Sequence, residues 1–256
     1  MRIIVTALLA LGLVATALAT TASAQTLLSE SFTYPDGGLV PNGGWATHSG
    51  TGTDIQVASG VAAGNMANGP DDNRLLSSAR LATDKTYACF RVLIPTPTLP
   101  LVCNYFAHFM VNSTTFRSKV FVTPSGSTFT FGLSVTANAA GAPLAPPAPP
   151  LGATWGTALN YDQWYSVVIS YNGVGGVSEL WVDPVDETST SISCTDAGAA
   201  NGALTAFGLR ESNTSSCAYL WNVDNLGVGT TFLDACDPAV PTIKSTWGQL
   251  KSIYRN

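Results

Sequence analysis

The feature that most constrains this fold is a succession of short apolar or alternating segments, each bounded by Gly, Pro, Asn or Ser. Segments of this kind are typical of β-strands. No comparable stretch inside the domain predicts an amphipathic helix, so we predict an all-β fold in which two antiparallel sheets stack as a sandwich. The predicted strands are 27–32, 55–57, 87–94, 105–111, 119–123, 128–135, 164–171, 178–182, 203–210 and 219–228.

The composition agrees with short strands joined by tight loops. Only 11% of the residues are charged, and the chain holds 24 Gly and 15 Pro. Such a balance favours strands and turns over helices. Residues 142–152 are rich in Pro, which cannot donate to a strand ladder, so we expect a stiff loop on the surface there. The alternative is a ligand for a proline-recognising module.

The first residues have the three parts of a secretory signal peptide. Arg2 precedes an apolar run over 3–19, and small residues follow at Ala22 and Ala24. This pattern predicts cleavage after Ala24, hence a signal peptide at 1–24 and a sandwich domain at 25–237. The alternative is a transmembrane anchor, which needs roughly 20 apolar residues and no cleavage site, and no later segment is apolar for long enough to span a bilayer. We therefore expect a secreted or cell-surface protein.

Export changes how the five cysteines are interpreted, because thiols tend to pair in an oxidising compartment. Their spacing does not resemble that of zinc ligands. We predict one disulfide between Cys89 and Cys103, across a hairpin, and another between Cys194 and Cys217. Cys236 would then be unpaired, unless it replaces a member of the second pair.

The domain is acidic. Residues 25–237 contain seven Lys or Arg against sixteen Asp or Glu. Nucleic acid is not an expected partner, because its binding needs a positively charged surface.

The last residues differ from the domain in charge and pattern. Residues 238–256 contain three basic residues and no acidic one, and apolar residues recur at three-to-four spacing after Ser245. This pattern predicts a linker and a short amphipathic helix that is too short to be stable alone. The tail resembles the short terminal segments of many exported bacterial proteins, which implies recognition by sorting machinery. The alternative is a docked or disordered end.

Three stretches, 30–45, 164–184 and 207–230, resemble the concanavalin A-like (LamG-like) jelly-roll domains of exported bacterial proteins. The resemblance implies two antiparallel sheets and pairing of the first strand with the last. The Gly-rich segment 172–176 independently predicts a hairpin turn, because its residues tolerate positive φ.

One predicted strand carries a candidate sugar-binding face. If the apolar residues of 178–182 face the core, alternation places Glu179, Trp181 and Asp183 on the opposite face. An aromatic ring flanked by carboxylates suits the apolar face and the hydroxyls of a pyranose. The alternative is that a loop, such as the Pro-rich one, covers Trp181. Trp155, beside that loop, is a further candidate for an exposed ligand-binding ring.

Two carboxylates are candidate metal ligands. Pairing of the terminal strands would bring Glu30 close to Asp224, and with backbone carbonyls they could hold a structural calcium ion, which takes six to eight oxygens. Alternatively, Asp224 accepts hydrogen bonds from turn amides next to Asn225. The acidic run 71–73 lacks the rest of a calcium-loop pattern and is interpreted as a turn. No other cofactor is expected.

No catalytic pattern stands out. The chain lacks the Glu-x-Asp-x-x-Glu run of retaining glycosidases on this fold, a Gly-x-Ser-x-Gly run and a paired-histidine metal motif. Its two histidines are His48 and His108, and Arg is scarce for a lyase-type Arg, His and Tyr cluster. We therefore predict an exported, non-catalytic protein that binds glycans or extracellular matrix. The alternatives are a polysaccharide-degrading enzyme on the same scaffold and a structural envelope component without a ligand.

Overall fold

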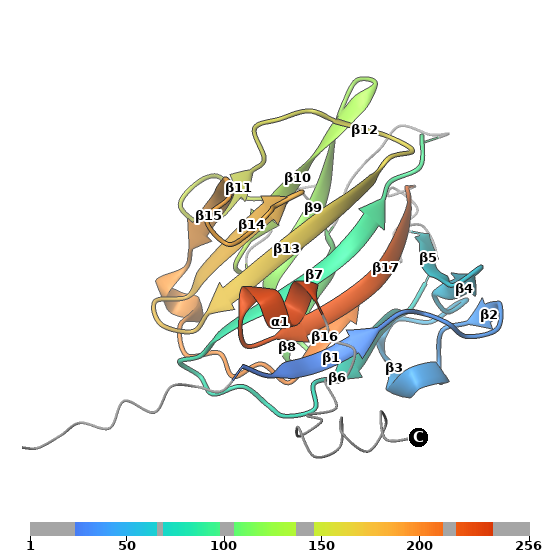
Figure 1. Ribbon diagram of the computed structural model, residues 1–256, viewed down its shortest axis with the longest axis horizontal. Helices are drawn as coiled ribbons and strands as arrows, with labels where there is room; N and C mark the ends of the chain where they lie inside the picture. Colours follow the sequence, from blue (N-terminus) through green and yellow to red (C-terminus); the bar gives the residue numbers. More distant parts are fainter. Residues whose placement is uncertain (1–23, 66–68, 98–104, 137–145, 212–218, 238–256) are drawn as a thin grey trace, which may run out of the picture.

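The computed structural model describes residues 24–65, 69–97, 105–136, 146–211 and 219–237. Over these residues the chain forms two antiparallel β-sheets stacked face to face, as Figure 1 shows, which confirms the predicted β-sandwich. Sheet A has the order β15-β14-β13-β7-β17-β5-β4-β2, with β1 also paired to β17, and sheet B has the order β11-β10-β9-β8-β16-β6-β3, with β12 also paired to β10.

Sheet A contains β1 (Thr26–Glu30), β2 (Gly37–Gly38), β4 (Gln56–Ala58), β5 (Val61–Asn65), β7 (Lys85–Leu93), β13 (Trp164–Asn172), β14 (Val177–Val182), β15 (Ser191–Thr195) and β17 (Leu220–Gly229). Sheet B contains β3 (Trp45–Ser49), β6 (Asp71–Leu75), β8 (Tyr105–Asn112), β9 (Thr115–Ser125), β10 (Thr128–Ser134), β11 (Gly152–Thr154), β12 (Leu159–Asn160) and β16 (Ala206–Leu209). The helical elements are α1 (Phe232–Cys236) and two 3-10 turns, Asn42–Gly44 and Ala197–Ala199. No helix in these ranges is long and apolar enough to cross a membrane.

Apolar side chains from both sheets meet in one core. Phe90 of sheet A contacts Phe106 and Phe207 of sheet B, with ring centroids 6.1 and 5.9 Å apart. All three rings are buried, and aromatic pairs at such distances add to the gain from area burial. The core therefore fixes how the two sheets lie on each other.

Two predicted strand pairings are confirmed. Strand β1 pairs antiparallel with β17, so the first and last strands of the sandwich are neighbours. Strands β13 and β14 form the predicted hairpin, closed by the pair Asn172 and Val177. Gly176 adopts φ +64° in the turn, and a Cβ there would lie 2.2 Å from the carbonyl oxygen of Asp196. A residue with a side chain would not fit.

Helix α1 covers part of the outer face of sheet A (Figure 1). Thr231 caps the helix by accepting a hydrogen bond from the Asp234 amide at 3.2 Å. Phe232 packs edge-on against Trp181 and Tyr87, with ring centroids 5.7 and 6.1 Å away. As a result the centre of sheet A is buried on both faces, which explains why residues 167–169 of β13 are all apolar and fully buried.

The structure corrects the predicted disulfides. Cys89 of β7 is bonded to Cys236 of α1, with 5.0 Å between their Cα atoms. The predicted Cys89–Cys103 bond is wrong because β7 and β8 belong to different sheets and form no hairpin. Cys194, which was predicted to pair with Cys217, is instead a buried free thiol. Cys103, Cys217 and the predicted tail 238–256 lie outside the described residues.

Candidate functional site

The predicted sugar-binding face around Trp181 is not open. Alternation correctly placed Trp181 on the outer face of sheet A, but the side chain is only 1% exposed. Helix α1 covers it through Phe232, and Tyr87 of β7 lies beside it. The prediction of an exposed ring is therefore wrong: the cover is a short C-terminal helix, not the Pro-rich loop.

The other residues predicted to bind a ligand have structural partners. Glu179 forms an ion pair with Lys85 at 2.8 Å. Asp183 is exposed, and its carboxylate accepts the backbone N–H of Ser166 at 2.7 Å. Trp155 is half-buried and packs against the main core. With Trp181 covered, these side chains do not form a common platform for a sugar ring.

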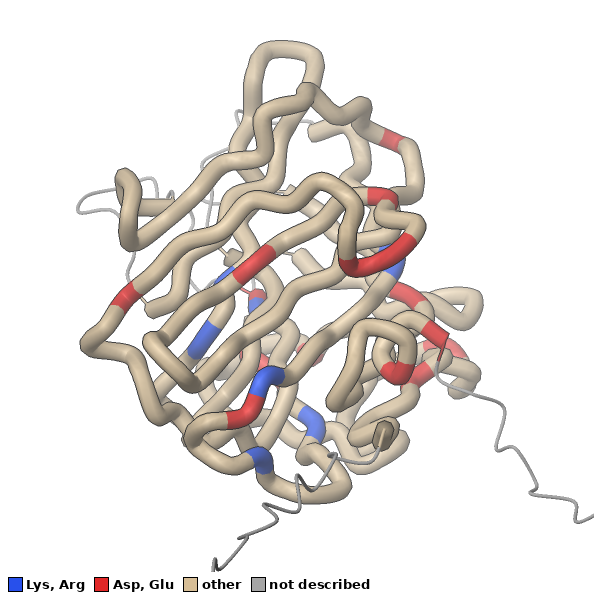
Figure 2. Tube along the Cα trace, turned by 60° about the vertical axis from the view of Figure 1, so that its left-hand side comes forward, with Lys and Arg blue, Asp and Glu red and all other residues tan. Residues whose placement is uncertain are grey.

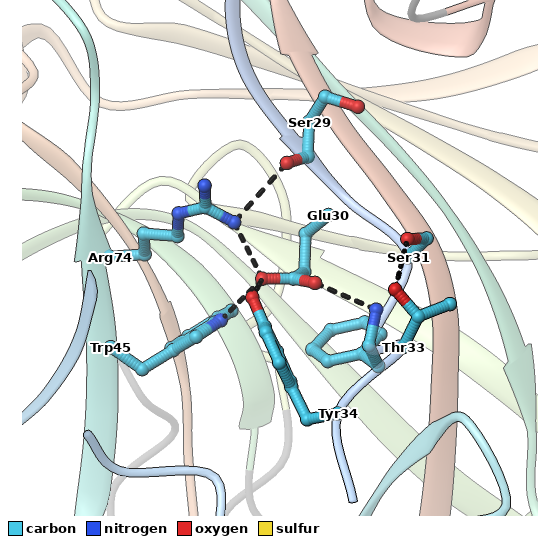
Figure 3. Close-up of polar contacts among 8 residues, drawn as sticks. Ser29, Glu30, Ser31, Thr33, Tyr34, Trp45 and Arg74 are labelled. Carbon is cyan, nitrogen blue, oxygen red and sulfur yellow. Dashed lines mark hydrogen bonds and ion pairs between the residues drawn. The ribbon is translucent and has the colours of Figure 1, made fainter. Parts of the chain in front are cut away.

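Glu30, a predicted metal ligand, instead lies at the centre of a buried hydrogen-bond cluster (Figure 3). Its Oε2 atom accepts from Arg74 Nη1 at 2.5 Å, Tyr34 OH at 2.8 Å and Trp45 Nε1 at 2.9 Å. Its Oε1 atom accepts the Phe32 amide at 2.7 Å. Four donors thus surround a carboxylate that is 5% exposed, an arrangement that fixes the start of the domain.

Asp224, the other predicted metal ligand, has a separate partner. Its Oδ1 atom accepts the amide of Asn225 at 2.7 Å, the alternative that the sequence left open. Asn225 has φ +50° where the pairing of β17 with β7 shifts register, between Asp224 and Gly227. Across the described part of the chain, no three His, Cys, Asp or Glu side chains converge as metal ligands.

A site that the sequence did not reveal lies where three strands of sheet B end together. Strand β6 pairs with β3 on one side and β16 on the other, and runs antiparallel to both. The start of β6 therefore lies beside the last residue of β3 and the residues that follow β16. A polar cleft of about 170 Å³ opens there, lined by Ser49, Gly50, Gly69, Asp71, Arg210 and Glu211.

The acidic run 71–73, which was interpreted as a turn, is the beginning of strand β6. Ser49 Oγ donates to Asp71 Oδ2 at 2.9 Å, and Thr47 Oγ1 donates to Asp72 Oδ1 at 3.0 Å. Pairing on both edges holds this polar segment extended, although it has no apolar run of its own. The turn interpretation was wrong for that reason.

Arg210 and Asp71 place an unpaired donor and an unpaired acceptor among the residues that line the cleft. Arg210 Nε lies 3.3 Å from Asp71 Oδ2, and its guanidinium stacks 4.5 Å from the ring centroid of Tyr105. Arg210 Nη1 and Asp71 Oδ1 are buried and have no hydrogen-bond partner among the residues that the structure describes. Buried polar atoms are rarely left unpaired, so these two atoms indicate a place for a ligand.

Glu211 separates this cleft from a second one. Its Oε1 atom accepts a hydrogen bond from the Asn65 amide at 2.6 Å. Its Oε2 atom packs closely on Gly69, because a Cβ on Gly69 would lie only 2.1 Å from it. The second cleft has a volume of about 190 Å³ and is lined by Glu211 with Thr53, Asp54, Gln56, Ala63 and Asn65. We call the two together the paired clefts.

Burial raises the pKa values of two carboxyls in the paired clefts. Burial raises the pKa of Asp71 to about 6 and that of Glu211 to about 7, and nearby carboxylates add to the shift of Glu211. Burial raises the pKa of the adjacent Asp72 to about 6 as well. Figure 2 shows acidic positions outnumbering basic ones over the fold, and all sixteen acidic residues of the chain lie in the described ranges. In the described linings of the two clefts, the carboxyls of Asp54, Asp71 and Glu211 outnumber the one basic group, Arg210.

Both histidines lie near residues that line the first cleft: His48 precedes Ser49 in β3, and His108 contacts Tyr105, on whose ring Arg210 stacks. Phe207 and Leu209 point into the core, so Gly208 between them faces away from it, and a Cβ on Gly208 would lie 2.7 Å from His108 Nε2. The His108 ring lies 5.4 Å from the ring of Tyr105 and 5.9 Å from that of His48.

The two histidines are neutral at pH 7. Burial lowers the pKa of His48 to about 4 and that of the fully buried His108 well below its usual value. Within the described ranges, none of their four ring nitrogens has a hydrogen-bond partner. Tyr105 touches both Arg210 and His108, and so joins this pair to the first cleft.

Comparison with known proteins shows the fold alone. No family model and no curated protein matches the chain. Among solved structures, it is similar to the CBM2 module of the evolved Dit protein of Lactobacillus casei BL23 phage J-1, with 13% identity, TM-score 0.52 and coverage of 82% of this chain and 97% of that one. It is also similar to a sialidase, with 9% identity, TM-score 0.52 and coverage of 83% of this chain but only 19% of that one.

Proposed function

We propose that the chain is a glycan-binding β-sandwich domain that acts outside the cytoplasm and binds its ligand in the paired clefts. The unpaired Arg210 Nη1 donor and Asp71 Oδ1 acceptor carry the proposal. A sugar presents neighbouring hydroxyls that both donate and accept, so a single sugar unit can satisfy both atoms. The similarity of the fold to a CBM2 module is in keeping with this function.

The size and charge of the clefts favour short stretches of neutral sugar. Each cleft is smaller than the roughly 300–1,000 Å³ of a typical drug-sized site, so each fits about one sugar unit. Asp54, Asp71 and Glu211 would repel an anionic group while accepting hydrogen bonds from hydroxyls. Arg210 and Gln56 supply donors. Since Glu211 borders both clefts, two consecutive units of one glycan would contact it from either side.

The disulfide supports the proposed location. Cys89 and Cys236 join two elements that lie 147 residues apart in the sequence. Such bonds persist in oxidising compartments and are rare in the cytosol. Together with the signal peptide predicted at 1–24, the bond supports secretion or display at the cell surface.

The experiment starts from protein that begins at Gln25, applied to an array of neutral and acidic glycans. Calorimetric titration then measures the affinity for the strongest binder. Arg210→Met should weaken binding about tenfold or more, because a hydrogen bond to a charged group contributes about 1.5–3 kcal/mol. Arg91→Met is the matched control, since Arg91 also stacks on an aromatic ring, that of Trp164 at 5.0 Å, but belongs to sheet A.

Thermal melting of both variants shows whether each is folded at the temperature of the titration. Absence of binding to any glycan, or equal losses in the two variants, would contradict the proposal.

The histidine pair supports a second candidate, a polysaccharide-degrading enzyme. Neutral imidazoles can accept and donate protons, and the nitrogens of His48 and His108 have no partner in the described part of the chain. Tyr105 connects His108 to Arg210 of the first cleft. Incubation of the bound glycan with the protein separates the two functions. New chain ends that accumulate with time, and that are lost in His108→Asn, would support the enzyme; binding without turnover supports the binding domain.

A further inference from the structure

The backbone nitrogen of Gln25 lies between two acceptors at the edge of the sandwich. It is 2.9 Å from Asp234 Oδ2 of α1 and 3.0 Å from Thr230 Oγ1. The Thr230 amide returns a hydrogen bond to the carbonyl oxygen of Gln25 at 3.0 Å. Two side-chain oxygens thus converge on one main-chain nitrogen immediately before β1 begins.

The surroundings of this nitrogen are acidic. A cavity of about 560 Å³ lies next to it, and its described lining includes three acidic residues, Asp186, Glu187 and Asp234, and no Lys or Arg. The remaining lining residues are Ala24, Thr188, Thr231, Phe232 and Leu233. Glu187 is paired with Lys85 at 3.0 Å. Asp234 forms no ion pair with any residue that the structure describes. A cation placed beside Asp234 would complete the site.

The predicted cleavage site and the hydrogen bonds of Gln25 coincide at the Ala24–Gln25 peptide bond. The small residues Ala22 and Ala24 predict leader cleavage between Ala24 and Gln25, and Gln25 is the residue whose nitrogen contacts Asp234. We propose that removal of the leader creates an α-ammonium group at Gln25 that Asp234 and Thr230 bind, so that processing fastens β1 to α1. The inference rests on the proposed signal peptide and is independent of glycan binding.

The chemistry follows from hydrolysis of the Ala24–Gln25 peptide bond. Water adds across the bond, Ala24 leaves as a carboxylate, and the released amine of Gln25 takes up a proton. An amide has one N–H to share between Asp234 and Thr230. An ammonium has three N–H groups, and its positive charge can pair with the carboxylate of Asp234. Processing therefore replaces one shared hydrogen bond by an ion pair with a separate donor for each acceptor.

Asp234 is held in place before this group forms. A Cβ on Gly229 would lie 2.5 Å from the Asp234 Cβ, so the glycine allows α1 to approach the end of β17 closely. The Cys89–Cys236 bond and the packing of Phe232 fix the helix on sheet A. Little conformational entropy is then lost when the ammonium binds.

The rate at which the N-terminal Gln25 cyclises reports on its pairing with Asp234. The neutral α-amine of Gln25 can attack its own side-chain amide carbon, forming a lactam and expelling ammonia. Pairing with Asp234 keeps the amine protonated and directed away from that carbon. An exposed ion pair is worth about 0.2–1 kcal/mol, so the pair should slow cyclisation by up to about fivefold.

The test expresses the full chain in an exporting host and measures intact mass over time. We expect an N-terminus at Gln25, and loss of one ammonia about two- to fivefold faster in Asp234→Asn than in the unsubstituted protein. Asp186→Asn, which changes a neighbouring carboxylate, should cyclise like the unsubstituted protein. Thr230→Val should give a smaller acceleration, and provides a second measurement if Asp234→Asn does not fold.

Two results would overturn the inference: a processed chain that begins at another residue, or equal cyclisation rates in the unsubstituted protein, Asp234→Asn and Thr230→Val. Glycan titration of the same variants keeps this outcome separate from the proposed function, because neither residue lines the paired clefts.

Discussion

Replacing Glu211 by Gln should make the protein more stable at high pH and leave it unchanged at low pH. Glu211 is 4% exposed, and its Oε1 atom accepts the Asn65 amide. Burial and nearby carboxylates raise its pKa from 4.5 to about 7. Folding thus favours the protonated form: its stabilising contribution is complete below pH 4.5 and is lost as the pH rises through 7. Gln has the shape of the protonated acid at every pH.

The size of the effect follows from the shift. Each pKa unit corresponds to about 1.36 kcal/mol, so a rise from 4.5 to about 7 costs the wild-type protein about 3 kcal/mol at pH 8. Glu211→Gln should therefore exceed the wild type by a free energy of unfolding of about 3 kcal/mol at pH 8, by less at pH 6, and by almost nothing at pH 4.

Urea denaturation followed by tryptophan fluorescence at these three pH values measures the difference directly. Glu179→Gln is the control, because Glu179 lies on sheet A in an ion pair with Lys85 and should show no gain at pH 8. A difference between Glu211→Gln and wild type that does not change with pH would refute the reasoning, as would one that grows toward low pH.

Three further changes test the packing around the site. Glu30→Ala leaves the buried Phe32 amide and Trp45 Nε1, and the partly buried Arg74, without their acceptor, and should lower the free energy of unfolding by about 3–5 kcal/mol in urea; a loss below about 1 kcal/mol would contradict the central place given to this carboxylate. Cys236→Ser removes the Cys89–Cys236 cross-link and should cost about 2–5 kcal/mol, so an unchanged free energy of unfolding would contradict this bond. Trp181→Ala should cost about 3–5 kcal/mol in stability but leave the glycan affinity unchanged, so a selective loss of binding would restore Trp181 as a ligand residue.

The central strands could be predicted because a strand that is buried on both faces has a continuous run of apolar residues. Residues 164–171 are apolar at the middle and alternate at the ends, and they form β13 between β7 and β14. Strand β6 has no such apolar run. It begins with Asp71 and Asp72, and it is a strand only because β3 and β16 pair with its two edges. Pairing between segments far apart in the chain is not visible in local periodicity.

What covers the outer face of sheet A could not be predicted from local periodicity either. Alternation fixed the face on which Trp181 lies but carried no information on what covers that face. The cover is α1, and the disulfide that holds it joins cysteines 147 residues apart. The prediction chose the cysteine nearest in sequence to Cys89, on the assumption of a hairpin that the crossover between sheets rules out.

The paired clefts were beyond prediction because their residues are neighbours only in the sheet. Ser49, Asp71 and Arg210 come from three separate strand ends, and their meeting depends on the order β3-β6-β16 and on its register. One local signal was present: His108 is a polar residue in the otherwise apolar run 105–111, with Gly208 opposite it in β16. This histidine marks a polar position on the face of sheet B that points away from the core, and that position is itself buried.

The location of the bound sugar tests the account most directly. Backbone amide chemical shifts can be followed by NMR while the glycan selected on the array is added to the processed protein. The account predicts that the largest changes fall on Gly50, Gly69, Arg210 and Glu211, while the amide of Trp181 stays in place. Changes centred on Trp181 and its neighbours in sheet A, with the paired clefts unaffected, would contradict it.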